Sequence, residues 1–242
     1  MVDEGQRHIV VLSGGLRRDE AGAYESSGLT AYMLGLVTTR SRPRICLIQT
    51  ANGDNANAYL NWYSAFAGRD VETSHLALFP MPSVADPRKL LLEQDVILVG
   101  GGSVANLAAV WRVHGLDVIL REAWEAGVIL AGGSAGAICW FEGGTTDSYG
   151  LELRPFREGL GLLPGTYTPH YDSESRRRPT YQRLVGDGTL AAGWASDDGT
   201  AMHFVGSELV DVVTERPDAT AWRVDPAPGG GVTEVRLDAR LI

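Results

Sequence analysis

The sequence predicts an α/β protein in which helices cover both faces of a three-layer, mostly parallel sheet, with antiparallel hairpins near the C-terminal end. Short apolar runs recur along the first half of the chain, and glycine-rich turns and helix-like stretches separate them. Near-continuous apolar runs are typical of strands that are buried on both faces of a parallel sheet. After Ala191 the pattern changes to alternating apolar and polar residues, which predicts hairpins that extend the sheet or cover its edge.

The expected elements follow in chain order. Strands are expected over residues 8–12, 45–49, 76–79 and 96–99, and a further strand begins at residue 128. Helices are expected over residues 56–66 and 105–113 and around residues 122–125. The hairpin strands are expected over residues 200–205, 208–214, 219–224 and 232–237. No linker, repeat or low-complexity segment stands out, so the whole chain, 1–242, is expected to form one domain.

Composition narrows the class of protein. A chain of 242 residues with 44% hydrophobic residues is of ordinary globular type and is long enough to bury a core. No apolar run approaches the roughly 20 residues that span a bilayer. Residues 1–7 contain no apolar secretory core, so a cytoplasmic protein without a membrane partner is expected. A net charge of −9 argues against a nucleic-acid partner, because phosphate binding needs a basic face.

The pattern of cysteines and histidines predicts no cofactor. Cys46 and Cys139 both lie inside apolar runs, which favours buried, reduced thiols over a disulfide. No histidine pair or cysteine cluster has the spacing of metal ligands, and no P-loop lysine follows a glycine-rich turn. We therefore expect a site that works without metal or nucleotide.

The most informative segment is residues 128–140, V-I-L-A-G-G-S-A-G-A-I-C-W, with Ser134 at its centre. An apolar run, two glycines, a serine and small residues predict a buried strand, a sharp turn and a helix. The G-x-S-x-G spacing of Gly132, Ser134 and Gly136 suits a nucleophile, because the turn is cramped and a substrate must approach the backbone closely. The alternative is a serine that merely caps the following helix.

A nucleophilic serine needs a base, and His170 is the best candidate. It lies in a loop-like segment after Pro169, whose fixed φ helps to set the direction of the imidazole. Structural roles at strand entries, at a helix end or within a strand explain the other histidines, which are His8, His75, His114 and His203. A lone loop histidine is itself more often structural than catalytic.

Asp147, just beyond the helix that Ser134 begins, is the candidate for the acid that orients this base. A simple turn-forming role is the alternative for Asp147. Four other carboxylates compete for the orienting role: Glu142, Glu152, Asp172 and Glu174. The order serine, aspartate, histidine resembles that of α/β-hydrolases, although it is much more compressed here.

A second glycine-rich turn, Gly100-Gly101-Gly102-Ser103, follows a predicted buried strand. In an acyl-transfer enzyme it would supply one backbone N–H of an oxyanion hole, and the N–H of Ala135 would supply the other. The competing interpretation is a dinucleotide site. It is weak, because the motif falls outside the first βαβ unit and no acidic residue clearly ends the following strand.

Segments 100–107, 133–137, 145–147 and 169–171 together resemble peptidase E, the serine-dependent aspartyl dipeptidase family that is related to cyanophycinase. The resemblance covers about residues 45–198. It implies a flavodoxin-like fold related to class I glutamine amidotransferases. It also implies Ser134 as nucleophile, His170 as base, Asp147 as orienting acid, and Gly101 in the loop that donates to the oxyanion. Gly102 of the same loop and Ala135 complete the expected oxyanion hole. Glu152 remains a candidate for the orienting acid, because the related cyanophycinases use a glutamate in that role.

The chain also departs from that family. The glycine loop often reads Gly-Gly-Asn-Thr, whereas this chain has Ser103 and Val104 after Gly102, so Ser103 becomes a candidate substrate contact. An arginine that holds the substrate carboxylate is expected after the histidine, and Arg176 matches it best, since a guanidinium pairs well with a carboxylate. A solvated charge run is the alternative for residues 176–178.

The expected function is a serine peptidase that hydrolyses short peptides, with dipeptides bearing an N-terminal aspartate as candidate substrates, through an acyl-enzyme on Ser134. The expected partner is a small peptide, and the expected assembly is a monomer or homodimer. Two alternatives remain: a hydrolase of the same mechanism acting on β-aspartyl peptides or esters, and a catalytically silent binding domain.

Overall fold

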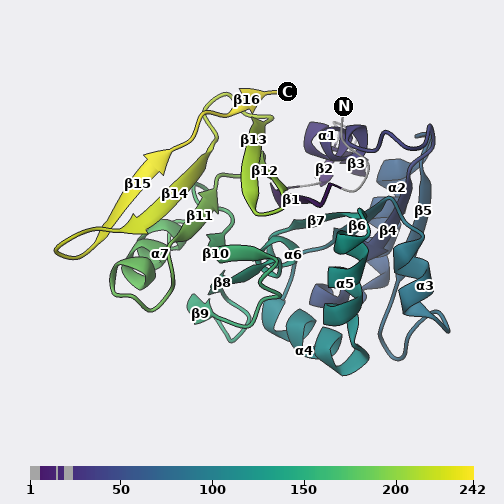
Figure 1. Cartoon of the computed structure of the whole chain (residues 1–242), viewed down its shortest axis with the longest axis horizontal. Helices are drawn as coiled ribbons and strands as arrows, with labels where there is room; N and C mark the ends of the chain where they lie inside the picture. Colours follow the sequence, from purple (N-terminus) through teal and green to yellow (C-terminus); the bar gives the residue numbers. More distant parts are fainter. Residues whose placement is uncertain (1–5, 15, 19–23) are drawn as a thin grey trace.

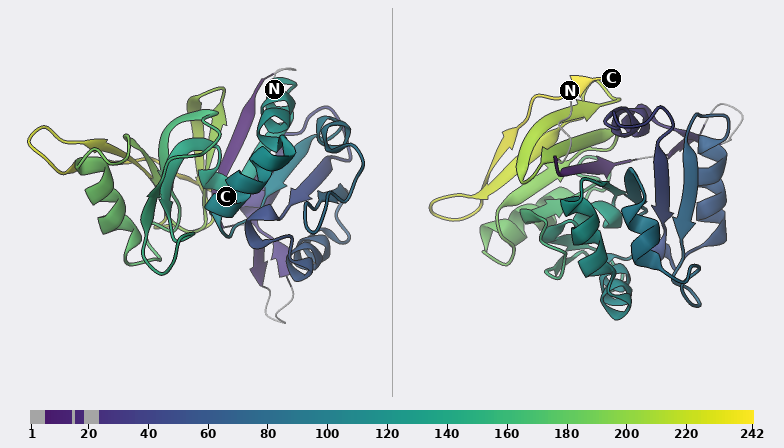
Figure 2. Two further views of the ribbon diagram at one scale, coloured as in Figure 1. Left: turned by 90° about the horizontal axis from the view of Figure 1, so that it is seen from below. Right: turned by 45° about the vertical axis from the view of Figure 1, so that its right-hand side comes forward.

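The computed structural model describes residues 6–14, 16–18 and 24–242 (Figure 1). Two sheets lie side by side in it, the larger one flanked by helices and the smaller one toward the C-terminal part of the chain (Figures 1 and 2). Of the segments discussed above, residues 1–5 lie outside the described residues.

The larger sheet has eight strands, and its centre is parallel. Each parallel neighbour pairs in register with the next, so the carboxyl ends of these strands share one edge. The parallel strands, in spatial order, are β1 (His8–Ser13), β7 (Ile129–Gly133), β6 (Val96–Val99), β4 (Arg44–Ile48) and β5 (Glu72–Leu76). On the other side of β1 lie the antiparallel β12 (Thr200–Val205) and β13 (Glu208–Thr214), and then β16 (Arg240–Leu241).

Helices cover both faces of the parallel strands, because alternate strand residues point to opposite faces. One apolar cluster joins one set of these residues to α3 (Pro87–Leu92), α4 (Val104–His114) and α5 (Leu116–Glu125). A second cluster joins the other set to α1 (Gly28–Gly35) and α2 (Ala56–Phe66). The expected three-layer α/β fold is therefore confirmed.

The smaller sheet has six strands. Its strands over residues 221–226 and 232–236 match the hairpin strands expected over 219–224 and 232–237, but a second sheet was not expected. Several of its strands are short and contain Gly or Pro, which weakens a strand pattern. The helix α7 (Arg177–Gly186) packs on this sheet through a separate apolar cluster that includes Tyr181 and Leu184. Its strands, in spatial order, are β15 (Val232–Arg236), β14 (Ala221–Pro226), β11 (Gly193–Ser196), β10 (Leu163–Thr168), β8 (Phe141–Thr146) and β9 (Arg154–Phe156).

The two sheets share apolar contacts. The ring of Phe141 in β8 lies edge-on to that of Phe204 in β12, with centroids 5.9 Å apart.

A two-stranded ribbon of β2 (Leu16–Arg18) and β3 (Tyr24–Ser26) also follows β1 in the chain. The assignment of the whole chain to one domain stays a prediction.

Most of the expected elements match the structure, and the differences have local causes. The helix over residues 56–66 and the strands over 96–99, 200–205 and 208–214 are confirmed to the residue. The strand expected over 76–79 is wrong: the edge strand β5 covers Glu72–Leu76 instead. This strand is only half-buried and reads E-T-S-H-L, so its residues do not form the apolar run that marks a buried strand.

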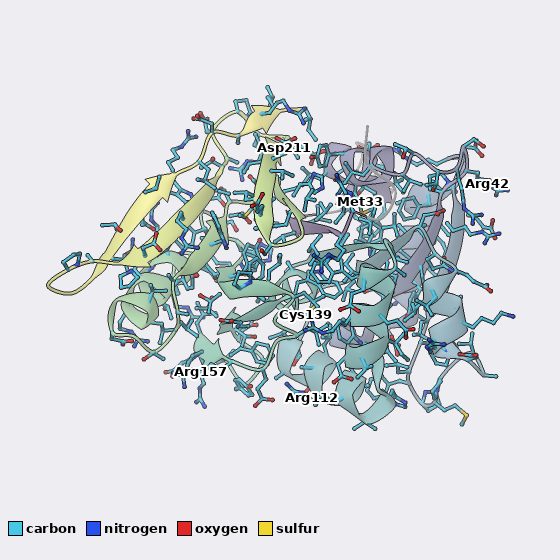
Figure 3. All side chains as sticks on the ribbon, in the orientation of Figure 1. Met33, Arg42, Arg112, Cys139, Arg157 and Asp211 are labelled. Carbon is cyan, nitrogen blue, oxygen red and sulfur yellow. The ribbon has the colours of Figure 1, made fainter. Side chains whose placement is uncertain are left out.

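Both cysteines are buried free thiols, as expected, and Cys139 lies in the packed interior (Figure 3). Burial raises the pKa of the Cys46 thiol to about 12 and that of Cys139 well above its usual range. Within the described ranges, the helices are too short or too polar for any of them to cross a bilayer.

Candidate active site

Five loops meet where the carboxyl ends of strands from both sheets come together. They follow β1, β6 and β7 of the larger sheet and β10 and β11 of the smaller sheet. Ligands of parallel α/β sheets bind at this edge, because the connecting loops gather there. The loops bring together the side chains of Ser13, Ser134, His170 and Asp198.

Ser134 follows β7 directly and has φ 54° and ψ −116°, a conformation that is unusual for a residue with a side chain. Its side chain makes no capping hydrogen bond to α6 (Ala135–Ile138), so the helix-cap interpretation is wrong. The expected helix is only this single turn. The small neighbours are needed, since a Cβ at Gly136 would overlap the carbonyl oxygen of Val99 and a Cβ at Gly132 that of Gly136.

His170 lies two residues after β10 and faces Ser134. Its Nε2 is 3.1 Å from Ser134 Oγ, within hydrogen-bond reach of the hydroxyl. His170 also has a positive φ, 56°, and its backbone N–H donates to Ser13 Oγ at 3.0 Å. Ser13 thus ties the backbone of His170 to the end of β1.

Asp198 lies at the other nitrogen of the imidazole. Its Oδ1 is 2.6 Å from His170 Nδ1 and 3.1 Å from Ser13 Oγ. The backbone of Asp198 is held as well: its N–H donates to Asp172 Oδ1 at 2.9 Å, and its carbonyl accepts from Arg216 Nη1 at 3.0 Å. Neither Asp198 nor Ser13 was expected from the sequence. Asp198 stands before Gly199 between two strands, and an Asp-Gly pair there indicates an ordinary turn.

The surroundings of Asp198 favour its charged form. Burial on its own raises the pKa of this carboxyl, but hydrogen bonds from His170, Ser173 and Ser13 and the charge of His170 outweigh it. The pKa falls to about 2. A carboxylate that stays ionised next to an imidazole holds the Nδ1–H tautomer, which leaves the Nε2 lone pair pointing at Ser134.

Asp147, the expected orienting acid, does not occupy the position beside His170. It lines a separate cavity of about 410 Å³ together with Glu174 and Arg176. The topology of the fold explains this difference. Asp147 follows β8, whereas the imidazole of His170 points toward the loop after β11, which contains Asp198.

The competing carboxylates also have other surroundings. Glu142 accepts from the N–H of Gly165 at 3.2 Å, and Asp172 accepts from Asp198 N and from Arg216. Glu174 pairs with Arg177, and Glu152 is exposed.

The glycine loop after β6 lies against Ser134, as expected. A Cβ placed on Gly101 would come within 3.1 Å of Ser134 Cβ and 3.6 Å of its Oγ, so the loop contacts the serine through its bare backbone. Across the described ranges, the N–H groups of Gly101 and Ala135 have no backbone acceptor.

A cavity of about 280 Å³ opens at Ser134 and His170. Its apolar walls are Leu12, Leu16, Trp62 and Leu98, and the side chain of Gln49 also lines it.

The two candidate substrate contacts are absent from the described lining of this cavity. Ser103 caps α4, with its Oγ accepting from Asn106 N at 3.2 Å. Arg176 lines the cavity around Asp147 instead. Its neighbours Arg177 and Arg178 pair with Glu174 and Glu234.

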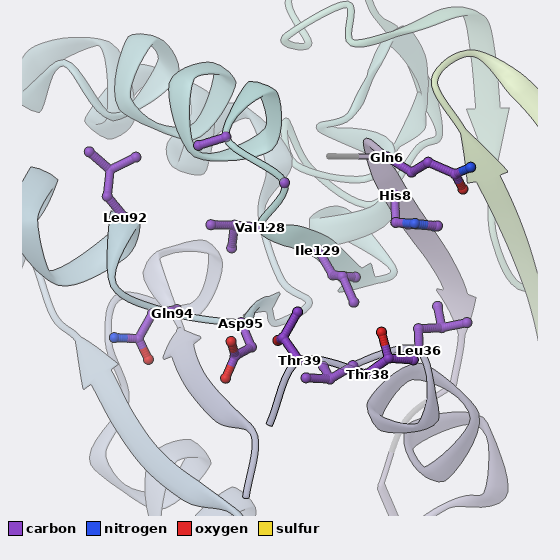
Figure 4. Close-up of a pocket in the computed structure, with 13 residues that line it drawn as sticks. Gln6, His8, Leu36, Thr38, Thr39, Leu92, Gln94, Asp95, Val128 and Ile129 are labelled. Atoms are coloured by element: carbon purple, nitrogen blue, oxygen red, sulfur yellow. The ribbon is translucent and has the colours of Figure 1, made fainter. Parts of the chain in front are cut away.

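Another cavity, of about 290 Å³, lies at the opposite, amino-terminal edge of the parallel strands (Figure 4). His8, Asp95 and Ile129 at the strand starts line it. It contains none of the residues that meet at Ser134. In the part of the chain that the structure describes, no three His, Cys, Asp or Glu side chains are grouped to hold a metal ion.

Sequence comparisons point to a peptidase family. The profile of Peptidase family S51 matches residues 9–212. YgaJ of Bacillus subtilis, named an uncharacterized peptidase, is 45% identical over 218 residues, which cover 90% of this chain and 92% of that protein. Peptidase E of Shewanella amazonensis is 38% identical over 88 residues, which cover 36% of this chain and 37% of the relative.

Solved structures share the fold. A peptidase from an acI-B1 Actinobacterium superposes with a TM-score of 0.67 at 18% identity, covering 98% of this chain and 96% of that one. A putative peptidase E protein from Listeria monocytogenes gives a TM-score of 0.60 at 16% identity, covering 85% of this chain and 97% of its own. At these identities the likeness concerns the fold.

Proposed function

This chain belongs to peptidase family S51, and we propose that it is a serine-type peptidase in which Ser134 is the nucleophile. The observation that carries the proposal is the continuous line of contacts from Ser134 Oγ through His170 to Asp198, at 3.1 and 2.6 Å. A serine, a base within reach and an acid that orients the base are what covalent catalysis by a weak nucleophile requires.

The proposed reaction proceeds in two halves. His170 Nε2 takes the proton of Ser134 Oγ as the oxygen attacks a peptide carbonyl carbon, and Asp198 stabilises the imidazolium that forms. His170 then gives this proton to the leaving amine, and the acyl group remains on Ser134. Water, deprotonated by His170, attacks the ester and releases the acid, and the proton returns to Ser134.

The N–H groups of Gly101 and Ala135 are the proposed oxyanion donors. The backbone of Gly101 lies against Ser134, and Ala135 is the next residue after Ser134 in the chain. The N–H groups of Gly101 and Ala135 would therefore stand near the carbonyl that Ser134 attacks. Gly102 keeps its proposed place in this loop: a Cβ there would overlap the carbonyl of Ala51, so the loop keeps its path only with glycine. Each oxyanion donor typically contributes about 3 kcal/mol to transition-state stabilisation.

The proposed substrates are short peptides, with dipeptides that carry an N-terminal aspartate as the first candidates. The small size of the cavity at Ser134, about 280 Å³, supports a short substrate. The aspartate preference rests on the resemblance of the motifs to peptidase E. We propose that the enzyme acts in the cytoplasm as a monomer or homodimer and without a cofactor.

Turnover of an aspartyl dipeptide such as Asp-Leu by wild type and Ser134→Ala tests the proposal. Ser134→Ala is expected to lower kcat by a factor on the order of 10⁴ or more, because the nucleophile is lost while the fold is kept. Wild-type Ser134 is also expected to react with a fluorophosphonate, and Ser134→Ala is not. Unchanged turnover in Ser134→Ala would remove Ser134 from the mechanism.

The other two functions give different outcomes. A hydrolase of β-aspartyl peptides or esters keeps the fluorophosphonate reaction but prefers those substrates in a panel. A silent binding domain shows neither turnover nor labelling.

A further inference from the structure

Gln49 is a buried polar side chain in the wall of the cavity at Ser134, and the proposed mechanism gives it no role. It follows β4 directly and is 2% exposed. It lines the same cavity as Ser134 and His170. Its amide packs against the glycine loop, since a Cβ added to Gly100 would collide with the amide group.

The backbone and the amide oxygen of Gln49 are fully engaged. Its N–H donates to the hydroxyl of Tyr59 at 3.3 Å, and its carbonyl accepts from the N–H groups of Asn52 and Asp54, both at 3.0 Å. Its side-chain Oε1 accepts from Asn52 Nδ2 at 2.8 Å. Because Asn52 donates to Oε1, the orientation of the amide is fixed and Nε2 is its other end.

The Nε2 group of Gln49 has no hydrogen-bond partner among the residues that the structure describes. An unsatisfied buried donor is costly, so a native structure that keeps one needs a reason for it. The other described walls of the cavity include Leu12, Leu16, Trp62 and Leu98, which offer no acceptor side chain. The Nε2 atom itself is covered, so an oxygen of a substrate in the cavity reaches it when the Gln49 side chain shifts slightly.

We propose that Gln49 is a specificity-determining residue whose Nε2–H donates to an oxygen on the side chain of the substrate's N-terminal residue. This inference rests on the proposed function. That residue carries the carbonyl that Ser134 attacks, so its side chain enters the cavity nearest to Ser134. An amide donor in an apolar pocket binds a carboxamide oxygen as well as a carboxylate oxygen. Recognition therefore requires an acceptor oxygen and not a full negative charge.

Three dipeptides whose N-terminal side chains are similar in size distinguish recognition of an acceptor oxygen from recognition of a negative charge. They are Asp-Leu, Asn-Leu and Leu-Leu. Wild type is expected to hydrolyse both Asp-Leu and Asn-Leu with a kcat/KM at least tenfold above that for Leu-Leu, because the pocket rejects a side chain that leaves its donor unpaired. In Gln49→Met, which keeps the length of the side chain and removes the donor, this preference is expected to fall about tenfold. The change is expected in KM more than in kcat.

A second variant changes the orientation of the amide and leaves Gln49 in place. In Asn52→Asp the new carboxylate accepts a hydrogen bond instead of donating one, so the amide of Gln49 turns and presents Oε1 to the cavity. The preference for Asn-Leu and Asp-Leu over Leu-Leu is expected to disappear in this variant. Gln94→Met, at the opposite edge of the sheet, is the matched control and is expected to keep it.

The result that overturns the proposal is an equal loss for all three dipeptides in Gln49→Met, which would mark a structural role. Hydrolysis of Leu-Leu by wild type at the rate of the other two, or no hydrolysis of Asp-Leu and Asn-Leu, would also overturn it. The rate of fluorophosphonate labelling of Ser134 is expected to be unchanged in Gln49→Met. Failure of the proposed function is distinguishable, because it abolishes labelling in the wild type as well.

Discussion

Ser134 and His170 lie 3.1 Å apart, and both residues are held at a positive φ, 54° and 56°. Among the described residues, Asp54 is the only other non-glycine residue with a positive φ. Such a backbone costs about 1–3 kcal/mol for a residue with a Cβ, and the surrounding structure must compensate. The two strained residues follow strands of different sheets, so the fold as a whole brings them together.

Removing the Cβ at position 134 is expected to stabilise the protein. Glycine adopts φ 54° and ψ −116° without strain, so Ser134→Gly is expected to have a free energy of unfolding about 1–2 kcal/mol above that of Ser134→Ala. Urea denaturation of the two variants measures the difference. Both lack the hydroxyl and are expected to be inactive. Equal midpoints would show that the backbone of Ser134 carries no strain.

Asp198 and Asp147 are distinguished by paired amide substitutions. Asp198→Asn is expected to lower kcat by a factor on the order of 10²–10⁴, because an amide at Asp198 Oδ1 no longer holds the correct imidazole tautomer. Asp147→Asn is expected to stay within about twofold of wild type. Steady-state hydrolysis of Asp-Leu measures both. A large loss in Asp147→Asn with none in Asp198→Asn would reverse the assignment.

Ser13 is expected to act as a positioning residue. Ser13→Ala removes the acceptor of the His170 backbone N–H and one donor to Asp198. One neutral hydrogen bond contributes about 1 kcal/mol, and the loss at a charged acceptor is larger, so kcat is expected to fall about tenfold while KM changes little. Ser148→Ala is the matched control, since its hydroxyl contacts Thr146. A rise in KM at constant kcat would instead place Ser13 in substrate binding.

A buried histidine pair is expected to make the fold acid-sensitive. His8 Nδ1 lies 2.8 Å from His203 Nε2, and Tyr32 links His203 to Asp211. Burial and the neighbouring His8 lower the pKa of His203 to about 4 from 6.5. Between pH 6.5 and about 4, His203 therefore binds a proton in the unfolded chain but not in the folded protein.

It follows that the free energy of unfolding is expected to fall as the pH drops from 6.5 to about 4, by at most about 3 kcal/mol from this group. Asp198, whose pKa is lowered to about 2 from 3.8, adds a second loss between those values. Urea denaturation against pH measures both, and His203→Leu is expected to flatten the upper part of the curve. His114→Gln, at the end of α4, is the control. An unchanged slope in His203→Leu would contradict the prediction.

The sequence was sufficient for the larger sheet and for the serine. Buried parallel strands such as β6 are unbroken apolar runs, and the crowding around Ser134 requires glycines that the sequence displays. The smaller sheet could not be predicted in the same way, because β8 and β10 contain glycine and proline and derive their order from packing on the rest of the protein.

The assignment of Asp198 as the acid that orients His170 was not predictable for a related reason. Asp198 is one of two adjacent aspartates in a turn, and nothing local separates it from Asp147. Its role depends on the pairing of β1 with β12, which places the loop before β12 beside Ser13 and His170. Gln49 was missed as well, because a glutamine after a strand becomes informative only when its partners are known.

The position of β1 between β7 and β12 has a consequence during synthesis of the chain. A ribosome releases Ser13 first, Ser134 much later, and His170 and Asp198 later still. On the proposed mechanism, a nascent chain that already contains the nucleophile has neither the base nor the acid that activates it. On this mechanism, hydrolytic activity therefore begins only after Asp198 and the strands that hold it have left the ribosome.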